Sequence, residues 1–442
     1  MKPSLSKTIA ALGASLIGGL SLAASAGDVA IVHAGQLLAD PSGTVLTGHS
    51  VVIRDGKVAA ILPGYVEDAG AGATAEDTVK IYDLKSMFVL PGLIDNHVHI
   101  TSENNPQGRL QSVQMSDPDR AINGAGFARK TLMAGFTTVR DVGARGGDAV
   151  FALRDGINRG DVVGPHLFSS GSTISVTGGH GDGTQGYRDD IAHVLHSTGV
   201  CDGVGSCRNA VREQVRRGAD HIKLTATAGV LSNTSAGLEQ QFFADELKAI
   251  MDTAHSMGRR VTAHAHGVQG INAALEAGVD SIEHGTYLDK DSIRLFKRNG
   301  AYLVPTLLAG ATVTEWAADP DSFLTPPQRE KAAEVGPRMQ DMLRRAHDGG
   351  VKIAFGTDSG VSAHGDNALE FGLMVAAGMS AKEAIIAATL SAADNMGKLD
   401  QFGSLEPGKS GDLIAVDGNP LTDVTELEDV DFVMKSGIAY KQ

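Results

Sequence analysis

Aromatic residues are scarce in this chain of 442 residues, at 5% of the total, whereas glycine is plentiful, with 55 residues. Such a composition is typical of a fold with many short junctions between strands and helices. No segment is low in complexity and no repeat recurs at a fixed period, which excludes solenoids and propellers. The 38 Lys and Arg residues form no cluster, and a formal charge of −14 makes nucleic acid a poor partner.

Long apolar runs are also missing beyond the N-terminus, so we expect no stable membrane insertion. Residues 1–26 combine a positively charged start, the apolar run Ile9–Leu22 and the small-residue cleavage pattern Ala24-Ser-Ala26. We expect them to be a signal peptide, so that a mature chain starting at Gly27 is exported to the periplasm or secreted. An uncleaved anchor is the alternative, although a transmembrane helix needs ~20 apolar residues.

The chain has two cysteines, Cys201 and Cys207, which enclose a short loop. Export would place them in an oxidising compartment, where neighbouring cysteines tend to form a disulfide. Two free thiols are the alternative. A zinc knuckle is not expected, because neither cysteine has a CxxC partner, three residues away.

Both ends of the chain carry short strand-like segments. In residues 27–88, apolar runs flank Asp55-Gly56, which is a strong hairpin signal. Residues 401–442 have a similar pattern, and the ends of a domain usually lie close together. We therefore expect these two segments to form one composite β-sandwich.

Residues 89–400 alternate strand-like and helix-like segments. The expected strands are Leu93–Ile100, Thr137–Val142, His166–Ser170, His221–Thr225, Arg260–His266, Ser281–His284, Tyr302–Leu307 and Lys352–Asp358. The clearest helical patterns are Asp245–Met257, Ile271–Ala277, Pro327–Asp348, with Pro327 at its first position, and Lys382–Met396. Eight strands with a helix after each predict an α/β fold, a (β/α)8 TIM barrel. An open doubly wound sheet is the alternative, but it would need a glycine-rich phosphate loop after the first strand.

Polar residues that can bind metal lie at several strand ends, where a barrel presents its catalytic groups. They are His97 and His99 on strand 1, Lys223 on strand 4, His264 and His266 on strand 5, His284 on strand 6 and Asp358 on strand 8. Alternate residues of a strand share a face, so both histidines of each pair can point into the mouth of the barrel. A lone histidine is more often an ordinary hydrogen-bonded residue near the core, but this set favours zinc or a similar divalent ion.

The chain resembles the binuclear-metal branch of the amidohydrolase superfamily, and in particular its exported, prolidase-like members related to Xaa-Pro dipeptidases and ochratoxinase. The resemblance rests on Pro91-Gly-Leu-Ile-Asp-Asn-His-Val-His99, Thr137-Thr-Val-Arg-Asp141, His221-Ile-Lys223, Val261-Thr-Ala-His-Ala-His266, Ser281-Ile-Glu-His-Gly285, Gly356-Thr-Asp358 and Gly403-Ser-Leu-Glu-Pro-Gly-Lys-Ser-Gly-Asp412. These segments extend over nearly the whole mature chain.

The resemblance implies two divalent metal ions, with zinc as the expected metal. It assigns His97, His99 and Asp358 to one ion, and His264 and His284 to the other. It implies that Lys223 is carboxylated, as N6-carboxylysine, and bridges the ions. A hydroxide between the ions would be the nucleophile, and Asp358 would accept its proton and pass it to the leaving nitrogen.

Three further residues are candidates for contact with substrate. His266 faces the same side as His264, so either could be the strand-5 ligand, and the other would be a supporting residue. His180, flanked by glycines, is expected to be mobile and exposed; it could polarise a carbonyl, bind a carboxylate or be a plain loop histidine. Arg140, at the end of strand 2, could serve the site or form a structural ion pair. The loop Gly229–Gln241 could act as a lid with a hinge at Gly237.

Related deaminases carry a glutamate where this chain has Gly267, and they lack the strand-4 lysine, so the resemblance favours amide hydrolysis. The expected substrate is a small amide or dipeptide cleaved at its C-terminal amide bond, N-acyl amino acids and ochratoxin-type amides included. The alternatives are a lactonase or an imidazolonepropionase-like ring opener, and a non-catalytic metal-binding barrel. The sequence is compatible with a homo-oligomer but does not require one.

Overall fold

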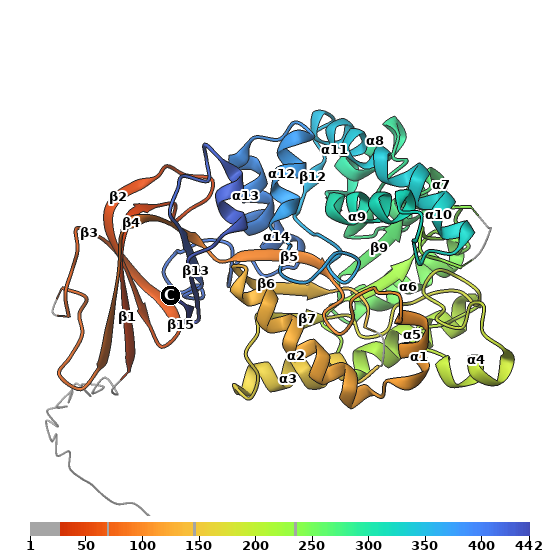
Figure 1. Ribbon diagram of the computed structural model, residues 1–442, viewed down its shortest axis with the longest axis horizontal. Helices are drawn as coiled ribbons and strands as arrows, with labels where there is room; N and C mark the ends of the chain where they lie inside the picture. The colour runs from red at the N-terminus through yellow and green to blue at the C-terminus, as the bar shows by residue number, and fades with distance from the viewer. Residues whose placement is uncertain (1–26, 69, 145–146, 234–236) are drawn as a thin grey trace, which may run out of the picture.

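The computed structural model of the protein describes residues 27–68, 70–144, 147–233 and 237–442 (Figure 1). The segment predicted to be a signal peptide, residues 1–26, lies outside the described residues. Within the described ranges, no helix combines the length and the apolar character needed to cross a membrane.

Eight parallel strands form the central barrel, and all eight expected strands are present. They are β5 (Leu93–Val98), β6 (Phe136–Asp141), β7 (His166–Ser169), β8 (Ile222–Thr225), β9 (Val261–Ala265), β10 (Ser281–His284), β11 (Tyr302–Val304) and β12 (Lys352–Ile353). They pair as two arcs, β5-β6-β7 and β8 to β12. Backbone hydrogen bonds connect the arcs at both seams: Asn96 N donates to Phe355 O at 3.0 Å, and Thr225 N donates to Ile174 O at 3.0 Å.

Helices surround the strands (Figure 1). They are α2 (Asp117–Met133), α3 (Ala149–Arg159), α5 (Gly203–Arg217), α6 (Ala244–Ser256), α7 (Val268–Ala277), α8 (Lys290–Asn299), α9 (Leu307–Ala318), α10 (Pro326–Val335), α11 (Met339–Asp348), α12 (Leu369–Ala376), α13 (Ala381–Ile386) and α14 (Ala392–Asn395), with the shorter α1 (Gly108–Gln114) and α4 (Asp189–Leu195). Helical stretches thus follow the strands as the barrel prediction requires, and their apolar faces pack on the barrel core.

Two helix predictions need correction. The predicted helix Pro327–Asp348 is divided into α10 and α11 by a 3-10 turn, Gly336–Arg338. Pro337 lies in that turn, and a proline has no N–H to continue the α-helical hydrogen bonds. The first helical position belongs to Pro326 rather than Pro327, because Thr325 is the N-cap. The other predicted helix, Lys382–Met396, contains a π-helical segment, Ala387–Ser391.

Strands from the two ends of the chain share one seven-stranded sheet. They are β1 (Asp28–Leu37), β2 (Leu46–Arg54), β3 (Lys57–Pro63), β4 (Thr78–Pro91), β13 (Leu413–Val416), β14 (Phe432–Lys435) and β15 (Ile438–Lys441), in the order β15-β14-β13-β4-β1-β2-β3. The β2–β3 hairpin turns at Asp55 and Gly56, whose φ angles of 50° and 78° are those of a type I′ turn. This hairpin was predicted from the Asp-Gly pair.

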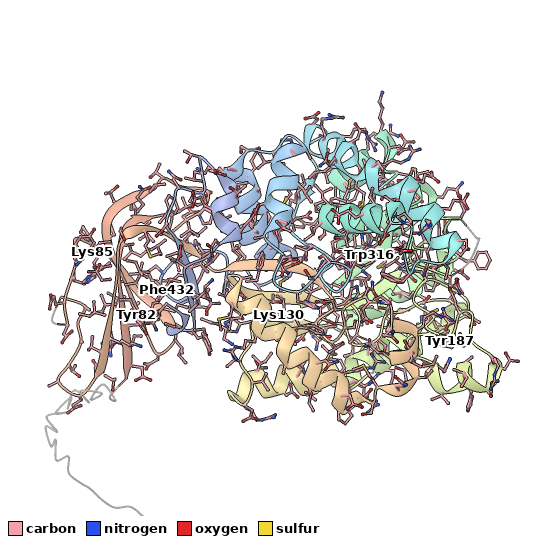
Figure 2. The ribbon with its side chains drawn as sticks, viewed as in Figure 1. Tyr82, Lys85, Lys130, Tyr187, Trp316 and Phe432 are labelled. Atoms are coloured by element: carbon pink, nitrogen blue, oxygen red, sulfur yellow. A yellow bond between two sulfur atoms is a disulfide. The ribbon has the colours of Figure 1, made fainter. Side chains whose placement is uncertain are left out.

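The two layers expected of a β-sandwich stay a prediction, and the hydrogen bonds join the seven strands into one continuous sheet. The reason is the length of β4, fourteen residues, which pairs with β1 along most of its course and with β13 at its end. Tyr82 of β4 and Phe432 of β14 contact edge to face, with ring centroids 5.4 Å apart, and both are labelled in Figure 2. β4 then leads through Gly92 into β5, so the terminal sheet and the barrel are directly continuous.

Cys201 and Cys207 form a disulfide, as the sequence predicted. The bond lies at the start of α5, and both cysteines are buried. It therefore closes a small loop on the strand-3 side of the barrel mouth.

Candidate metal centre

The predicted ligands come together at the C-terminal ends of the barrel strands. Two groups have potential ligand atoms within 4.8 Å of one another: His97, His99 and Asp358, and His264, His266 and His284. The groups adjoin, since the rings of His97 and His284 have centroids 5.2 Å apart. Each group could hold a metal ion, and the two sites would be neighbours.

The first group converges on one carboxylate oxygen. Asp358 Oδ1 lies 3.3 Å from His97 Nε2 and 3.1 Å from His99 Nε2. Despite these distances, Asp358 Oδ1 is buried and accepts no hydrogen bond from any described residue. A buried carboxylate oxygen without a donor is costly, and a cation between it and the two imidazoles would satisfy all three atoms. The donor set therefore fits a divalent metal ion.

Each imidazole of this group is held by its other ring nitrogen. His97 Nδ1 lies 2.7 Å from Glu283 Oε2, and His99 Nδ1 lies 2.6 Å from Gly143 O. An oxygen acceptor at Nδ1 fixes the proton there and leaves Nε2 with a lone pair. This is the tautomer that a metal ligand requires.

The second group has the same design. His284 Nδ1 lies 2.7 Å from Thr306 Oγ1, and His266 Nδ1 lies 2.8 Å from Thr286 Oγ1. The ring centroid of His284 is 4.6 Å from that of His264 and 4.8 Å from that of His266. Both His264 of β9 and His266, which directly follows β9, thus reach this group, and the choice of His264 as the ligand stays a prediction.

Lys223 lies inside the barrel on β8, with 4% of its surface exposed. Burial lowers the pKa of its ammonium to about 8, although Glu283 and Asp358 act in the opposite direction. Only a neutral amine can react with carbon dioxide, so this environment favours the carboxylation that the family resemblance implies.

Left-handed backbone marks the site. His284 and Asp358 have φ angles of 71° and 60°, and Thr306, which contacts His284, has 52°. Such angles are uncommon for residues other than glycine and cost about 1 kcal/mol or more each. Two of the predicted ligands thus adopt strained conformations at strand ends, where strain usually accompanies function.

Glu283 is a site residue that the sequence reasoning missed. It is completely buried, and it contacts His97 through one oxygen and Arg140 Nη2, at 2.9 Å, through the other. Burial alone would raise its pKa, but Arg140, His97 and Lys223 outweigh that effect and hold the pKa well below its usual value. The carboxylate is therefore ionised. An acidic residue in the middle of the buried run Ser281–His284 was the signal that could have revealed it.

Arg140 is 3% exposed and lies behind this carboxylate. Its Nε donates to Asn96 O at 2.6 Å, in addition to the ion pair with Glu283. These contacts match the structural ion pair, the second of the two roles considered for Arg140. They give it an indirect part in the site, since Glu283 in turn orients His97.

Asp95 is a second buried acid that was overlooked. It accepts hydrogen bonds from His97 N at 2.9 Å, Thr357 Oγ1 at 2.6 Å and Asn367 Nδ2 at 2.7 Å. This network connects strand 1 to strand 8 directly beneath His97 and Asp358. It explains why a polar residue lies at the centre of the buried strand β5.

His180 faces the second group from the loop after β7. Its ring centroid is 4.2 Å from that of His264, and its Nδ1 lies 2.7 Å from Ser232 Oγ. Burial lowers the pKa of the imidazole to about 3, with His266 and Lys223 contributing, so the ring is neutral. His180 is half-buried and hydrogen-bonded rather than fully exposed, and its mobility stays a prediction.

The loop predicted to be a lid, Gly229–Gln241, is described except for residues 234–236. Its last part turns back on the strand, since Ala228 N donates to Glu239 O at 3.0 Å. Gly237 as a hinge stays a prediction.

Comparisons with known proteins agree with this geometry. Residues 88–439 match the model of the Amidohydrolase family. Ochratoxinase from Aspergillus niger is 33% identical over 440 residues, which cover 93% of this chain and 87% of that protein. A crystal structure of a Xaa-Pro dipeptidase with bound methionine has a TM-score of 0.87 and 41% identity, over 94% of this chain and 100% of the other. A prolidase complexed with N-methylphosphonate-L-proline has a TM-score of 0.83 and 30% identity, with the same coverage.

Proposed function

The chain belongs to the amidohydrolase family, and from this we propose that it cleaves the C-terminal amide bond of dipeptides or N-acyl amino acids. The family and its prolidase and ochratoxinase relatives show that the chain is a metal-dependent hydrolase of amide or peptide bonds. The observation that carries the proposal is the convergence of two nitrogen-rich groups on one barrel mouth.

The proposed cofactors are two divalent ions, with zinc as the expected metal and N6-carboxylysine at Lys223 as the bridge. His97, His99 and Asp358 would hold one ion, and His264 and His284 the other. Bound there, the ions supply an activated water and a Lewis acid for the amide carbonyl. The lone buried amine of Lys223, facing two cations, would be unfavourable unless carboxylation turned it into an anion.

Two residues of the chain would handle the proton and the substrate. Asp358 would accept a proton from the attacking water and deliver it to the leaving nitrogen. His97 and His99 outweigh the effect of burial and hold its pKa well below the usual value, so it is present as the carboxylate. His180, a neutral imidazole beside His264, would polarise the carbonyl or bind the substrate carboxylate.

The substrate class rests on the relatives. One is a Xaa-Pro dipeptidase, one a prolidase complexed with a phosphonate derivative of proline, and one an ochratoxinase. Turnover of Xaa-Pro, Xaa-Arg, Xaa-Lys and N-acyl-Phe compounds, measured before and after chelation, tests the proposal. We expect metal-dependent release of the C-terminal amino acid from at least one of them. No turnover on the whole panel by protein that contains metal would reject the substrate class.

We also propose that residues 1–26 direct export, with cleavage before Gly27. Support comes from the apolar run and the small-residue pattern in the sequence. Edman sequencing of the protein recovered from the periplasm or medium should give Gly27 first. A cytoplasmic protein that retains Met1 would contradict this.

A further inference from the structure

Helix α10, which follows the seventh barrel strand (β11), binds a turn that follows the fourth barrel strand (β8). Lys331 of α10 donates from Nζ to Gly229 O at 3.0 Å and to Ser232 O at 2.8 Å. One helical turn away, Gln328 Nε2 donates to Leu231 O at 2.6 Å. Three backbone carbonyls of one short turn are thus bound by two side chains of the same helix.

The other side of that turn holds His180. Ser232 Oγ lies 2.7 Å from His180 Nδ1. Gly229 lies flat against the imidazole, so that a Cβ at this position would come within 2.3 Å of His180 Cε1. The turn itself is closed by a hydrogen bond from Ser232 N to Gly229 O at 3.2 Å. The place of the imidazole therefore depends on the place of residues 229–232.

The burial of Lys331 needs an explanation. Only 9% of the residue is exposed, and burial lowers the pKa of its ammonium. Removing a charged amine from water is costly. A lysine that only stabilised a contact at the surface would not have to be buried. Two of its acceptors belong to the turn that holds His180, which indicates a role in the site.

We propose that Lys331 is a positioning residue for the amide hydrolysis proposed above. By fixing the turn Gly229–Ser232, it keeps the imidazole of His180 beside His264. There the imidazole would contact the substrate in the orientation that the reaction needs. The inference rests on the proposed function for its kinetic consequence. Its structural part, the dependence of His180 on Lys331, does not.

The main variant is Lys331→Met, which keeps the apolar stem and removes the donors. Lys382→Met is a matched control, because Lys382 Nζ also donates to two backbone carbonyls, Ser42 O at 3.0 Å and Gly43 O at 2.7 Å, in a different part of the chain. We expect Lys331→Met to lower kcat/KM by about tenfold or more, since small misplacements of an active-site group are costly. Metal content should be unchanged, and Lys382→Met should stay within about twofold of the wild type.

Two further variants separate positioning from general stability. Lys331→Arg retains two donors and should recover most of kcat/KM. Ser232→Ala removes the contact with His180 itself, and the double variant with Lys331→Met should be little worse than either single variant, because both act through one imidazole. Additive losses would overturn the proposal, as would loss of metal from Lys331→Met in proportion to activity.

A spectroscopic readout is independent of turnover. In protein labelled with 15N-histidine, the His180 signals are assigned by their absence in His180→Asn. We expect Lys331→Met and Ser232→Ala to shift these signals alike, whereas Lys382→Met leaves them unchanged. Unchanged signals in Lys331→Met would overturn the inference even in active enzyme. If the wild type hydrolyses no amide, the proposed function fails while these signals still decide the role of Lys331.

Discussion

The Nδ1 of His97 lies 2.7 Å from Oε2 of Glu283, a completely buried carboxylate on another strand of the barrel. Arg140 binds the second oxygen of the same carboxylate. A predicted metal ligand is therefore oriented from behind by an ion pair that crosses the barrel interior. A metal centre formed by these ligands would depend on the supporting residues as well.

Glu283→Gln should weaken metal binding. The amide cannot accept from both His97 and Arg140, and loss of such supporting partners typically lowers metal affinity about 10–100-fold. Competition with a chromophoric chelator measures the affinity. Glu213→Gln, which breaks a surface ion pair with Arg216, is the control. Equal affinities in wild type and Glu283→Gln would show that the contact does not orient His97.

Lys223 should carry a carbamate in the metal-loaded protein. Apoprotein reconstituted with metal and 13C-bicarbonate should give a carbamate carbon signal by NMR, and Lys223→Met should give none. Reconstitution in buffer freed of carbon dioxide should restore less activity than reconstitution with bicarbonate, because the bridging anion cannot form. Full activity without carbon dioxide would contradict the assignment.

Much of this centre could be predicted from the sequence because its ligands follow local rules. Alternation along a strand places His97 and His99 on one face, and a barrel brings strand ends together wherever they lie in the chain. The partners of those ligands obey no such rule. Glu283 reaches His97 across 186 residues of sequence, and Lys331 reaches Gly229 across 102, so only the folded chain shows the pairs.

The fold shows the same division. The eight strands, the Asp55-Gly56 turn and the disulfide each have a local signal. The break at Pro337 was also local but was hidden by a helical pattern that continues on both sides of it. The pairing of β4 with both β1 and β13 depends on how far one strand extends, which alternation alone does not determine.

The disulfide should stabilise the protein modestly. The two cysteines are six residues apart, and closing so short a loop is worth about 2 kcal/mol of unfolding free energy. Replacing both Cys201 and Cys207 by Ser should lower the unfolding free energy by about that amount in urea titrations. Reduction of the wild type should give the same loss. No change in either experiment would show that the bond is not formed in solution.

The terminal sheet should lose stability in acid through Asp77. The backbone N–H of Thr74, that of Gly27 and the Arg54 guanidinium lower the pKa of this carboxyl to about 2. Because the folded pKa lies below the unfolded value of about 3.9, the contribution is complete above that value and disappears as the pH falls towards 2. The difference in melting temperature between wild type and Asp77→Asn should therefore shrink from pH 6 to pH 3. A constant difference would contradict the assignment.

The most direct test of the central claim is the metal content of purified, active protein, measured by plasma emission spectroscopy together with amide hydrolysis. Two divalent ions per chain are expected, with parallel loss of ions and turnover in His97→Asn and His284→Asn. Full amide hydrolysis by protein with no bound divalent metal, or by these variants, would contradict the account.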